Sequence, residues 1–257
     1  MLIGMSTYVL VHGAWGGSYG WRKIRPLLQQ AGQQVFTPSL TGQGERSHLA
    51  TPDVTLSTHV QDVANAIWYE DLHDIILVGH SYGGMVVTGV AERMPERIKH
   101  LVYLDAFLPA DGQSLYDLGG GGPRASDDWR VPPLERTEDP KGPNDPEVPW
   151  NNERRVHHPR ATFEEKIALS RPLESRPFSL TYIVATGRPD SGSVFDRSAA
   201  ALRGNPRWAV REITGGHNMI TSNPTGLAAL FLDLFPDSEA PGGSSRPRAG
   251  VPAPARA

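Results

Sequence analysis

The chain has 257 residues, of which 39% are hydrophobic and 21% charged, a composition typical of a globular protein with a substantial buried core. A formal net charge of -3 and the lack of a basic stripe argue against nucleic acid as a partner. Since there is no cysteine, a disulfide framework, a thiolate metal site and a cysteine nucleophile are excluded, and the chain suits the reducing cytoplasm. The start of the chain, MLIGMSTYVLVHG, has no signal-peptide pattern, and no uncharged apolar run reaches the ~18 residues that span a bilayer. We expect a cytoplasmic protein without a membrane partner.

Short β-branched runs alternate with amphipathic stretches along most of the chain. Continuous apolar runs, each followed by a segment with helical period, are typical of strands buried on both faces and joined by crossover helices. The pattern predicts an α/β fold with a mostly parallel, doubly wound sheet. A last helix begins at Asn223 and Pro224, which suit the N-cap and the first turn. The earlier runs occupy residues 7–13, 19–32, 34–40, 57–72, 74–80, 84–94, 99–107, 179–187, 194–203 and 207–217.

The pattern changes over residues 109–178, where Pro, Gly and Asp are frequent and little periodicity remains. Only residues 161–170 look helical, with Thr162 and Glu165 spaced as a capping box. An irregular insertion of this length in a compact chain is usually functional or disordered. Because the segment carries large apolar side chains, among them Trp129 and Trp150, we expect a lid (cap) that packs on the rest of the protein.

These patterns divide the chain into three parts. The α/β core takes two stretches, and the lid lies between them. The C-terminal residues have almost nothing to bury and are predicted to form a disordered tail. The predicted bounds are 1–108 and 179–236 for the core, 109–178 for the lid and 237–257 for the tail.

The five residues GHSYG, from Gly79 to Gly83, match the pattern Gly-x-Ser-x-Gly. The pattern alone is a weak signal, but here an apolar strand precedes it and a helix follows it. A nucleophile on such a strand-to-helix turn needs small neighbours because the turn is cramped, and the helix N-terminus can bind a developing oxyanion. We predict that Ser81 is a nucleophile; the alternative is a tight turn with only a structural role.

A serine hydroxyl needs a base, which in this kind of fold is a later histidine. Of nine histidines, His217 alone follows the last predicted strand. The loop after the first strand, which contains Gly13, can supply a backbone amide beside the nucleophile. We expect the Ala14 and Tyr82 amides to form the oxyanion hole, with Trp15 as a weaker candidate. The alternative is that the glycines of this loop only make a tight turn.

Two aspartates compete for the role of the acid that orients His217. In chain order the acid should lie between nucleophile and base, at a strand end. Asp105 directly follows the run HLVYL, whereas Asp190 lies three residues past TYIVATG in a looser loop. A buried carboxylate at a strand end needs a partner such as a catalytic histidine. We favour Asp105 and keep Asp190 as the alternative.

The chain resembles the α/β-hydrolase superfamily, and within it the branch of plant methyl esterases and hydroxynitrile lyases and their bacterial esterase-like relatives. The resemblance rests on YVLVHGAWGGSYGW, FTPSLTGQGERSH, VGHSYGGMV, LVYLDAFLP and GGHNMI. It implies the α/β-hydrolase fold, Ser81 and His217 as nucleophile and base, and Ala14 and Tyr82 in the oxyanion hole. The plant members place the acid near Asp190, but the stretch IVATGRPDSG lacks their usual strand-end aspartate.

The departures from the resemblance bear on the reaction. Hydroxynitrile lyases of this branch have threonine where this chain has Gly13, and lysine where it has Asn218. Without that cation, a leaving cyanide loses its electrostatic stabilisation. We therefore expect a serine hydrolase, a carboxylesterase-like enzyme that acts on a small, moderately apolar ester; the alternatives are lyase chemistry in the same pocket and a non-catalytic receptor. Trp15 and Trp129 are the candidate substrate contacts, with a core-packing role as the alternative for Trp129 and Trp150. No metal or organic cofactor is implied, and both a monomer and a homodimer remain open.

Overall fold

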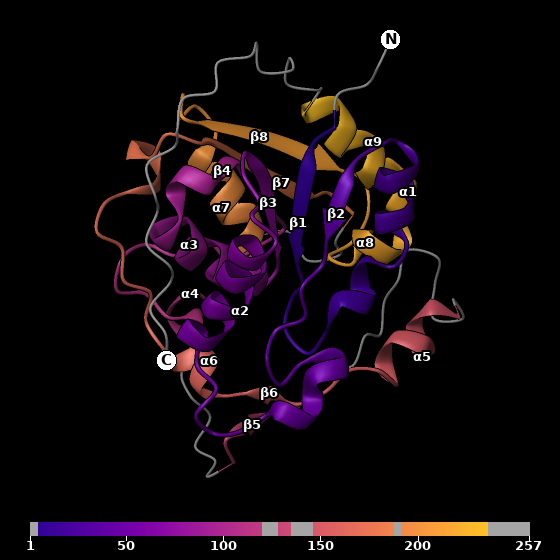
Figure 1. The fold of residues 1–257 in the computed structure, drawn as a ribbon, viewed down its shortest axis with the longest axis vertical. Helices are drawn as coiled ribbons and strands as arrows, with labels where there is room; N and C mark the ends of the chain where they lie inside the picture. Colours follow the sequence, from indigo (N-terminus) through magenta and orange to yellow (C-terminus); the bar gives the residue numbers. More distant parts are fainter. Residues whose placement is uncertain (1–4, 120–127, 135–145, 188–191, 236–257) are drawn as a thin grey trace.

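The computed structural model describes residues 5–119, 128–134, 146–187 and 192–235, so that Asp190 and the predicted tail lie outside the described residues. Six parallel strands form one sheet in the order β2-β1-β3-β4-β7-β8 (Figure 1). The predicted parallel sheet is confirmed. Its strands are β1 (Thr7–Val11), β2 (Gln34–Phe36), β3 (Ile75–His80), β4 (Ile98–Leu104), β7 (Ser179–Ala185) and β8 (Trp208–Ile213).

Helices cover both faces of the sheet, as the doubly wound pattern predicts (Figure 1). Successive side chains of a strand point to opposite faces. In β3, Ile75 and Leu77 therefore join the core under α2, α3 and α7, while Ile76 and Val78 join the core under α1, α8 and α9. These helices are α1 (Ile24–Gln30), α2 (Leu56–Tyr69), α3 (Gly83–Arg93), α7 (Val194–Leu202), α8 (Met219–Ser222) and α9 (Pro224–Leu234), with 3-10 turns η1 (Ser18–Trp21), η2 (Gly44–Leu49) and η3 (Pro95–Arg97).

Residues 109–178 contribute no strand to the main sheet within the described ranges. They form short elements, including an antiparallel pair of two-residue strands. Figure 1 shows them below the sheet, in the region reached by the carboxyl ends of the strands. The elements are α4 (Leu115–Gly119), β5 (Arg130–Val131), α5 (Glu147–Asn152), β6 (His158–Pro159), α6 (Ala161–Glu164) and η4 (Leu173–Ser175).

The capping box expected at Thr162 and Glu165 is wrong. Helix α6 is a single turn with Arg160 as its N-cap, and it ends before Glu165. The Thr162 hydroxyl donates to the carbonyl of Pro159, while the Glu165 carboxylate accepts from the backbone and hydroxyl of Ser57 at the start of α2. The Glu165 carboxylate therefore binds a residue distant in the sequence, Ser57, instead of capping the start of the helix.

No helix among the described residues is long and apolar enough to cross a bilayer.

Candidate active site

Ser81 stands on the turn between β3 and α3, as the strand-to-helix pattern predicts. Its φ of 55° lies in the left-handed region, which few side chains adopt without surrounding support. The support comes from backbone hydrogen bonds: the Ser81 carbonyl accepts from Gly84 at 3.0 Å and from Phe107 at 3.1 Å. This turn holds the serine at the carboxyl end of the sheet.

Two glycines make the turn possible because the chain has no room for a side chain beside Ser81. A Cβ on Gly79 would lie 2.6 Å from the carbonyl oxygen of Gly83. A Cβ on Gly83 would lie 2.7 Å from the carbonyl oxygen of Val11, at the end of β1. Both distances are shorter than real Cβ contacts, so close backbone approach requires glycine at both positions.

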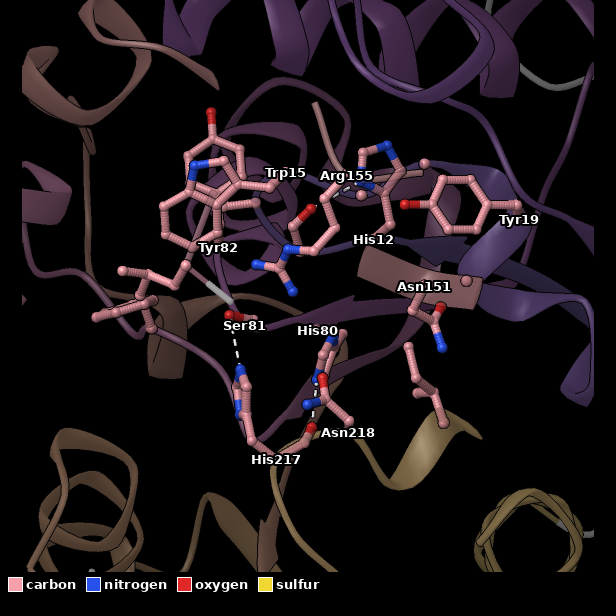
Figure 2. Close-up of a pocket in the computed structure, with 18 of the residues that line it drawn as sticks. His12, Trp15, Tyr19, His80, Ser81, Tyr82, Asn151, Arg155, His217 and Asn218 are labelled. Atoms are coloured by element: carbon pink, nitrogen blue, oxygen red, sulfur yellow. Dashed lines mark hydrogen bonds between the residues drawn. The ribbon is translucent and has the colours of Figure 1, made fainter. Parts of the chain in front are cut away.

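His217 lies beside Ser81, on the loop that follows β8. Its Nε2 is 3.0 Å from the Ser81 Oγ, so the serine hydroxyl can donate to the imidazole. The ring of Phe195 stacks on the imidazole at 4.8 Å between centroids, with 7° between the planes. On the backbone side, His80 Nε2 donates to the carbonyl of His217 at 2.8 Å (Figure 2). These contacts fix the position of the imidazole relative to the serine.

The Asp105 carboxylate completes the arrangement from the end of β4, and its side chain is 0% exposed. His217 Nδ1–H donates to Oδ2 of Asp105 at 2.7 Å, and the backbone amide of Ala185 donates to Oδ1 at 3.0 Å. Asp105 also has a positive φ, 44°, and its amide donates to the carbonyl of Ile183 at 2.7 Å. A proton on Nδ1 leaves Nε2 of His217 free to accept from Ser81.

Two backbone amides lie next to the serine. Tyr82 stands at the N-cap of α3, and the loop of Gly13 and Ala14 touches the serine so closely that a Cβ on Gly13 would lie 2.9 Å from the Ser81 Cβ. Within the described residues, neither the Ala14 amide nor the Tyr82 amide donates a hydrogen bond. The Trp15 amide, by contrast, donates to Nδ1 of His158 at 3.3 Å. Ala14 and Tyr82 therefore have amides available for an oxyanion, and Trp15 does not.

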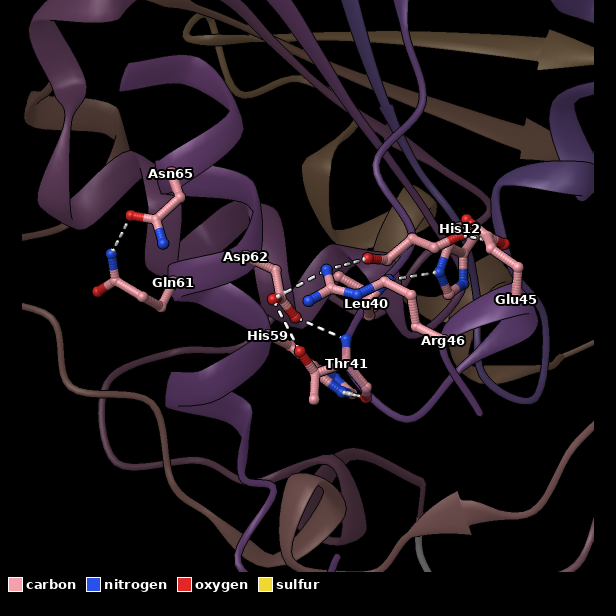
Figure 3. Close-up of polar contacts among 10 residues, drawn as sticks. His12, Leu40, Thr41, Glu45, Arg46, His59, Gln61, Asp62 and Asn65 are labelled. Atoms are coloured by element: carbon pink, nitrogen blue, oxygen red, sulfur yellow. Dashed lines mark hydrogen bonds and ion pairs between the residues drawn. The ribbon is translucent and has the colours of Figure 1, made fainter. Parts of the chain in front are cut away.

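Two buried histidines, His12 and His59, bond backbone and side-chain groups around the serine, and only His12 bonds the Gly13 loop itself (Figure 3). His12 Nδ1 donates to the carbonyl of Gly13 at 2.8 Å, and its Nε2 accepts from the amide of Leu40 at 3.2 Å. His59 Nε2 donates to the carbonyl of Thr41 at 2.8 Å, and its Nδ1 accepts from the Tyr82 hydroxyl at 2.9 Å. Burial lowers the pKa of His12 to about 4 and that of His59 to about 3. Both rings are therefore neutral near pH 7 and serve as hydrogen-bonding supports.

A cavity of about 450 Å³ opens over Ser81 (Figure 2). The loops after β1, β3, β4 and β8 form its base, and the segment 109–178 covers it with side chains from α4, α5 and α6. Its size is at the lower end of the range for small-molecule sites. The cavity is walled mainly by apolar and aromatic side chains, namely Ala14, Trp15, Tyr19, Tyr82, Phe107, Leu115, Leu134, Phe163, Phe195 and Ile220.

The structure brings most of the predicted site residues together but not all. Ser81, His217 and Trp15 line the cavity, with Asp105 buried behind His217. Trp129 is not among the described lining residues: its ring lies against the Arg130 guanidinium, 5.6 Å away, and its carbonyl accepts from the Arg160 amide. These contacts fit the alternative packing role of Trp129, and its substrate contact stays a prediction. The alternative acid, Asp190, lies outside the described residues.

Sequence reasoning missed two lining residues with chemistry of their own. Phe195 stacks on His217 from the start of α7, and Arg155 lines the cavity from the stretch after α5. The run ERRVHHPR is a basic cluster inside the predicted lid, which was the one available signal for Arg155. No local pattern pointed to Phe195, because its place depends on how α7 packs on the sheet.

Comparison with known proteins adds an independent observation. Residues 8–230 match the model of a protein family described as the alpha/beta hydrolase family. A carbendazim hydrolyzing esterase from Nocardioides sp. (strain SG-4G) is 39% identical over 248 residues, which is 90% of this chain and 100% of that protein. Methylesterase 1 of Arabidopsis thaliana is 32% identical over 104 residues, or 40% of each chain.

A solved structure extends the similarity to the fold. It is an extracellular alpha/beta-hydrolase from a Paenibacillus species that shares structural and functional homology with tobacco salicylic acid binding protein 2. The two chains superpose with a TM-score of 0.75 at 26% identity, over 89% of this chain and 98% of the other. The predicted fold and the predicted branch of relatives are both confirmed.

Proposed function

This chain belongs to the alpha/beta hydrolase family and is a carboxylic ester hydrolase, and we propose that it works through an acyl-enzyme formed on Ser81. The observation that carries the proposal is the unbroken chain of hydrogen bonds from Ser81 Oγ through His217 to Asp105, at 3.0 and 2.7 Å. The three side chains come from the ends of β3, β8 and β4, and such an arrangement activates a serine hydroxyl.

In the proposed reaction, Ser81 Oγ attacks the ester carbonyl carbon while Nε2 of His217 takes the hydroxyl proton. The carbonyl electron pair moves onto oxygen, where the Ala14 and Tyr82 amides stabilise the negative charge. The bond to the alkoxy oxygen then breaks, and the alcohol leaves with the proton from His217. A water molecule then attacks the acyl-enzyme in the same way, with His217 taking its proton. The carboxylic acid product leaves, and the proton returns from His217 to Ser81 Oγ. Asp105 stays ionised and holds the imidazole in the Nδ1–H form.

The proposed substrates are small esters with a moderately apolar body, because the cavity has a volume of about 450 Å³ and mostly apolar walls. Carbendazim belongs among the candidates, since a full-length relative is an esterase that hydrolyses it. Cyanohydrin cleavage is not favoured because Asn218, directly after His217, lines the cavity with a neutral amide where a cation is needed. We also propose a cytoplasmic location, since a chain without cysteine suits a reducing compartment.

The test combines covalent labelling with turnover. Wild type, Ser81→Ala and Ser175→Ala are incubated with a fluorophosphonate probe and assayed on aryl acetates, methyl esters and carbendazim. Ser175 is exposed and donates to the carbonyl of Pro172, so it is a matched serine outside the cavity. We expect Ser81→Ala alone to lose labelling and hydrolysis. A folded wild type that never labels, or a Ser81→Ala variant as active as wild type, contradicts the proposal.

A further inference from the structure

Arg155 is the only Asp, Glu, Lys or Arg side chain among the described residues that line the cavity. The other polar lining groups are neutral amides and hydroxyls, together with the rings of His12, His80 and His217. Burial lowers the pKa of the Arg155 guanidinium, but a guanidinium stays protonated at neutral pH. The cavity over Ser81 therefore contains a permanent positive charge and no carboxylate from these lining residues.

This charge has no counter-ion in the part of the chain that the structure describes. Among the described residues the Arg155 Nε is buried without a hydrogen-bond partner, and the group that raises the pKa of its guanidinium is the phenol of Tyr19, not a carboxylate. The adjacent Arg154 differs, since it is exposed, lies 3.5 Å from the Glu153 carboxylate and donates to the Trp150 carbonyl at 2.9 Å. A buried donor without a partner is unfavourable, so an acceptor that binds to this guanidinium would gain a favourable interaction.

The backbone around Arg155 is fixed to the wall of the cavity. Its own amide donates to the carbonyl of Asn152 at 3.2 Å, and the amide of Val156 donates to the carbonyl of Trp15 at 3.2 Å. The guanidinium lies over the indole of Trp15, 5.4 Å from the ring centroid. Figure 2 shows it directed into the cavity that also contains Ser81. These contacts hold Arg155 in place as part of the cavity wall.

We propose that this enzyme prefers esters that carry a free carboxylate, which pairs with Arg155 while Ser81 attacks the ester group. The inference rests on the proposed function and deepens it by naming the substrate class, half-esters of small dicarboxylic acids. A carboxylate matches the planar fork of a guanidinium with two parallel hydrogen bonds. A neutral substrate of the same shape would leave the guanidinium unpaired and would lose that interaction in both the bound and the transition state.

The test compares esters that differ only in charge. Monomethyl glutarate is paired with methyl glutaramate, and monomethyl terephthalate with methyl 4-carbamoylbenzoate, in each case carboxylate against isosteric amide. We expect wild type to show at least a tenfold higher kcat/KM for the carboxylate of one pair or both, and this ratio to fall with added salt. Arg155→Met should bring the ratio to about one, Arg155→Lys should keep part of it, and Arg154→Met should leave it unchanged.

A second measurement does not depend on turnover of these esters. Benzoate and benzamide are compared for their ability to slow fluorophosphonate labelling of Ser81. Stronger protection by benzoate in wild type, lost in Arg155→Met but kept in Arg154→Met, supports the inference. Equal protection by the two compounds, or amide esters cleaved as fast as their carboxylate partners in both pairs, overturns it while Ser81 still labels. If Ser81 does not label in folded protein, the proposed function itself is wrong.

Discussion

At the scale of single residues, the Asp105 carboxylate selects the proton position of the imidazole. Both its oxygens are occupied, one by His217 Nδ1–H and one by the Ala185 amide. In Asp105→Asn, the amide NH₂ turned toward Nδ1 would favour the tautomer protonated on Nε2, which cannot accept from Ser81. We expect kcat to fall by about 10⁴-fold with little change in fold. The measurement is ester turnover beside circular dichroism.

The matched control for this prediction is Asp111→Asn. Asp111 follows the same strand, and among the described residues its exposed carboxylate accepts only a loop amide, that of Leu169, so its loss should leave turnover near wild type. If Asp105→Asn kept a tenth or more of wild-type turnover, Asp105 would not be the acid, and Asp190 would be the next residue to replace.

Gly83 illustrates how one residue can hold the active-site turn together. A Cβ there would meet the carbonyl oxygens of Val11 and His12 at 2.7 and 2.9 Å, and these backbone atoms cannot rotate away. We expect Gly83→Ala to lower the free energy of unfolding by about 1–3 kcal/mol, the usual cost of overpacking, and to reduce turnover by moving Ser81. Urea denaturation measures the first effect. Gly119→Ala, where a Cβ has open space, should change neither quantity.

The residues that sequence reasoning could find are those with a local signature. Ser81, Asp105 and His217 each directly follow an apolar strand or its short exit loop in the expected chain order, and the structure brings them together. Arg155 and Phe195 have no such signature, because their contact with the cavity depends on the path of residues 109–178 and on the packing of α7. That path is set by contacts between distant parts of the chain.

At the scale of elements, the segment 109–178 holds the loop that carries the Ala14 amide, one of the two proposed for the oxyanion hole. Trp15 has a φ of 61°, and three of its polar groups are bound by that segment. Its amide donates to His158 Nδ1 at 3.3 Å, its carbonyl accepts from Val156 at 3.2 Å, and its indole Nε1 donates to Val131 at 3.1 Å. We call these three hydrogen bonds the Trp15 clamp. Since Ala14 directly precedes Trp15, a shift of this clamp would displace the Ala14 amide.

Replacing His158 should therefore affect the rate more than binding. In His158→Phe the Trp15 amide loses its acceptor, while a ring of similar size still packs against Phe163 and Tyr82. We expect kcat to fall about tenfold, less than the loss of a whole oxyanion donor, with KM little changed. His157→Phe is the matched control because His157 is exposed. Equal kcat in the two variants would show that the clamp does not position the loop.

Helices and strands were predictable from the sequence where they bury a face of regularly spaced apolar side chains. Elements without such a face were not predictable. The alternation of apolar runs and helical segments predicted the parallel sheet, and Asn223 caps α9 as expected by accepting from the Gly226 amide. The capping box at Thr162 failed because Glu165 binds Ser57 on α2, a partner more than one hundred positions away. Short elements such as α6 depend on tertiary contacts that local propensity does not encode.

At the scale of the whole molecule, the buried histidines make stability depend on pH. Burial lowers the pKa of His12 to about 4 and of His59 to about 3, and it lowers that of His158 well below its usual value. In the unfolded chain each has a pKa near 6.5. Between these values the unfolded state binds protons that the folded state does not. The free energy of unfolding therefore falls as the pH drops below about 6.5, down to about pH 4, where His12 begins to protonate in the folded state.

The half-buried His100 adds a fourth such group, since burial lowers its pKa to about 4. Four histidines titrating only in the unfolded chain set the upper limit of the histidine contribution, about 5 kcal/mol per pH unit near pH 5. Urea denaturation between pH 7.5 and 4.5 measures the slope of the free energy of unfolding against pH. This slope is proportional to the number of protons taken up on unfolding. In His59→Gln, whose amide can replace one of the two hydrogen bonds, the count should fall by about one. His48→Gln should leave the slope unchanged because His48 is exposed. A free energy of unfolding that stays constant from pH 7 to pH 5 would mean that water reaches the imidazoles of His12, His59 and His158 in the folded protein. Their hydrogen bonds would then not be shielded from solvent.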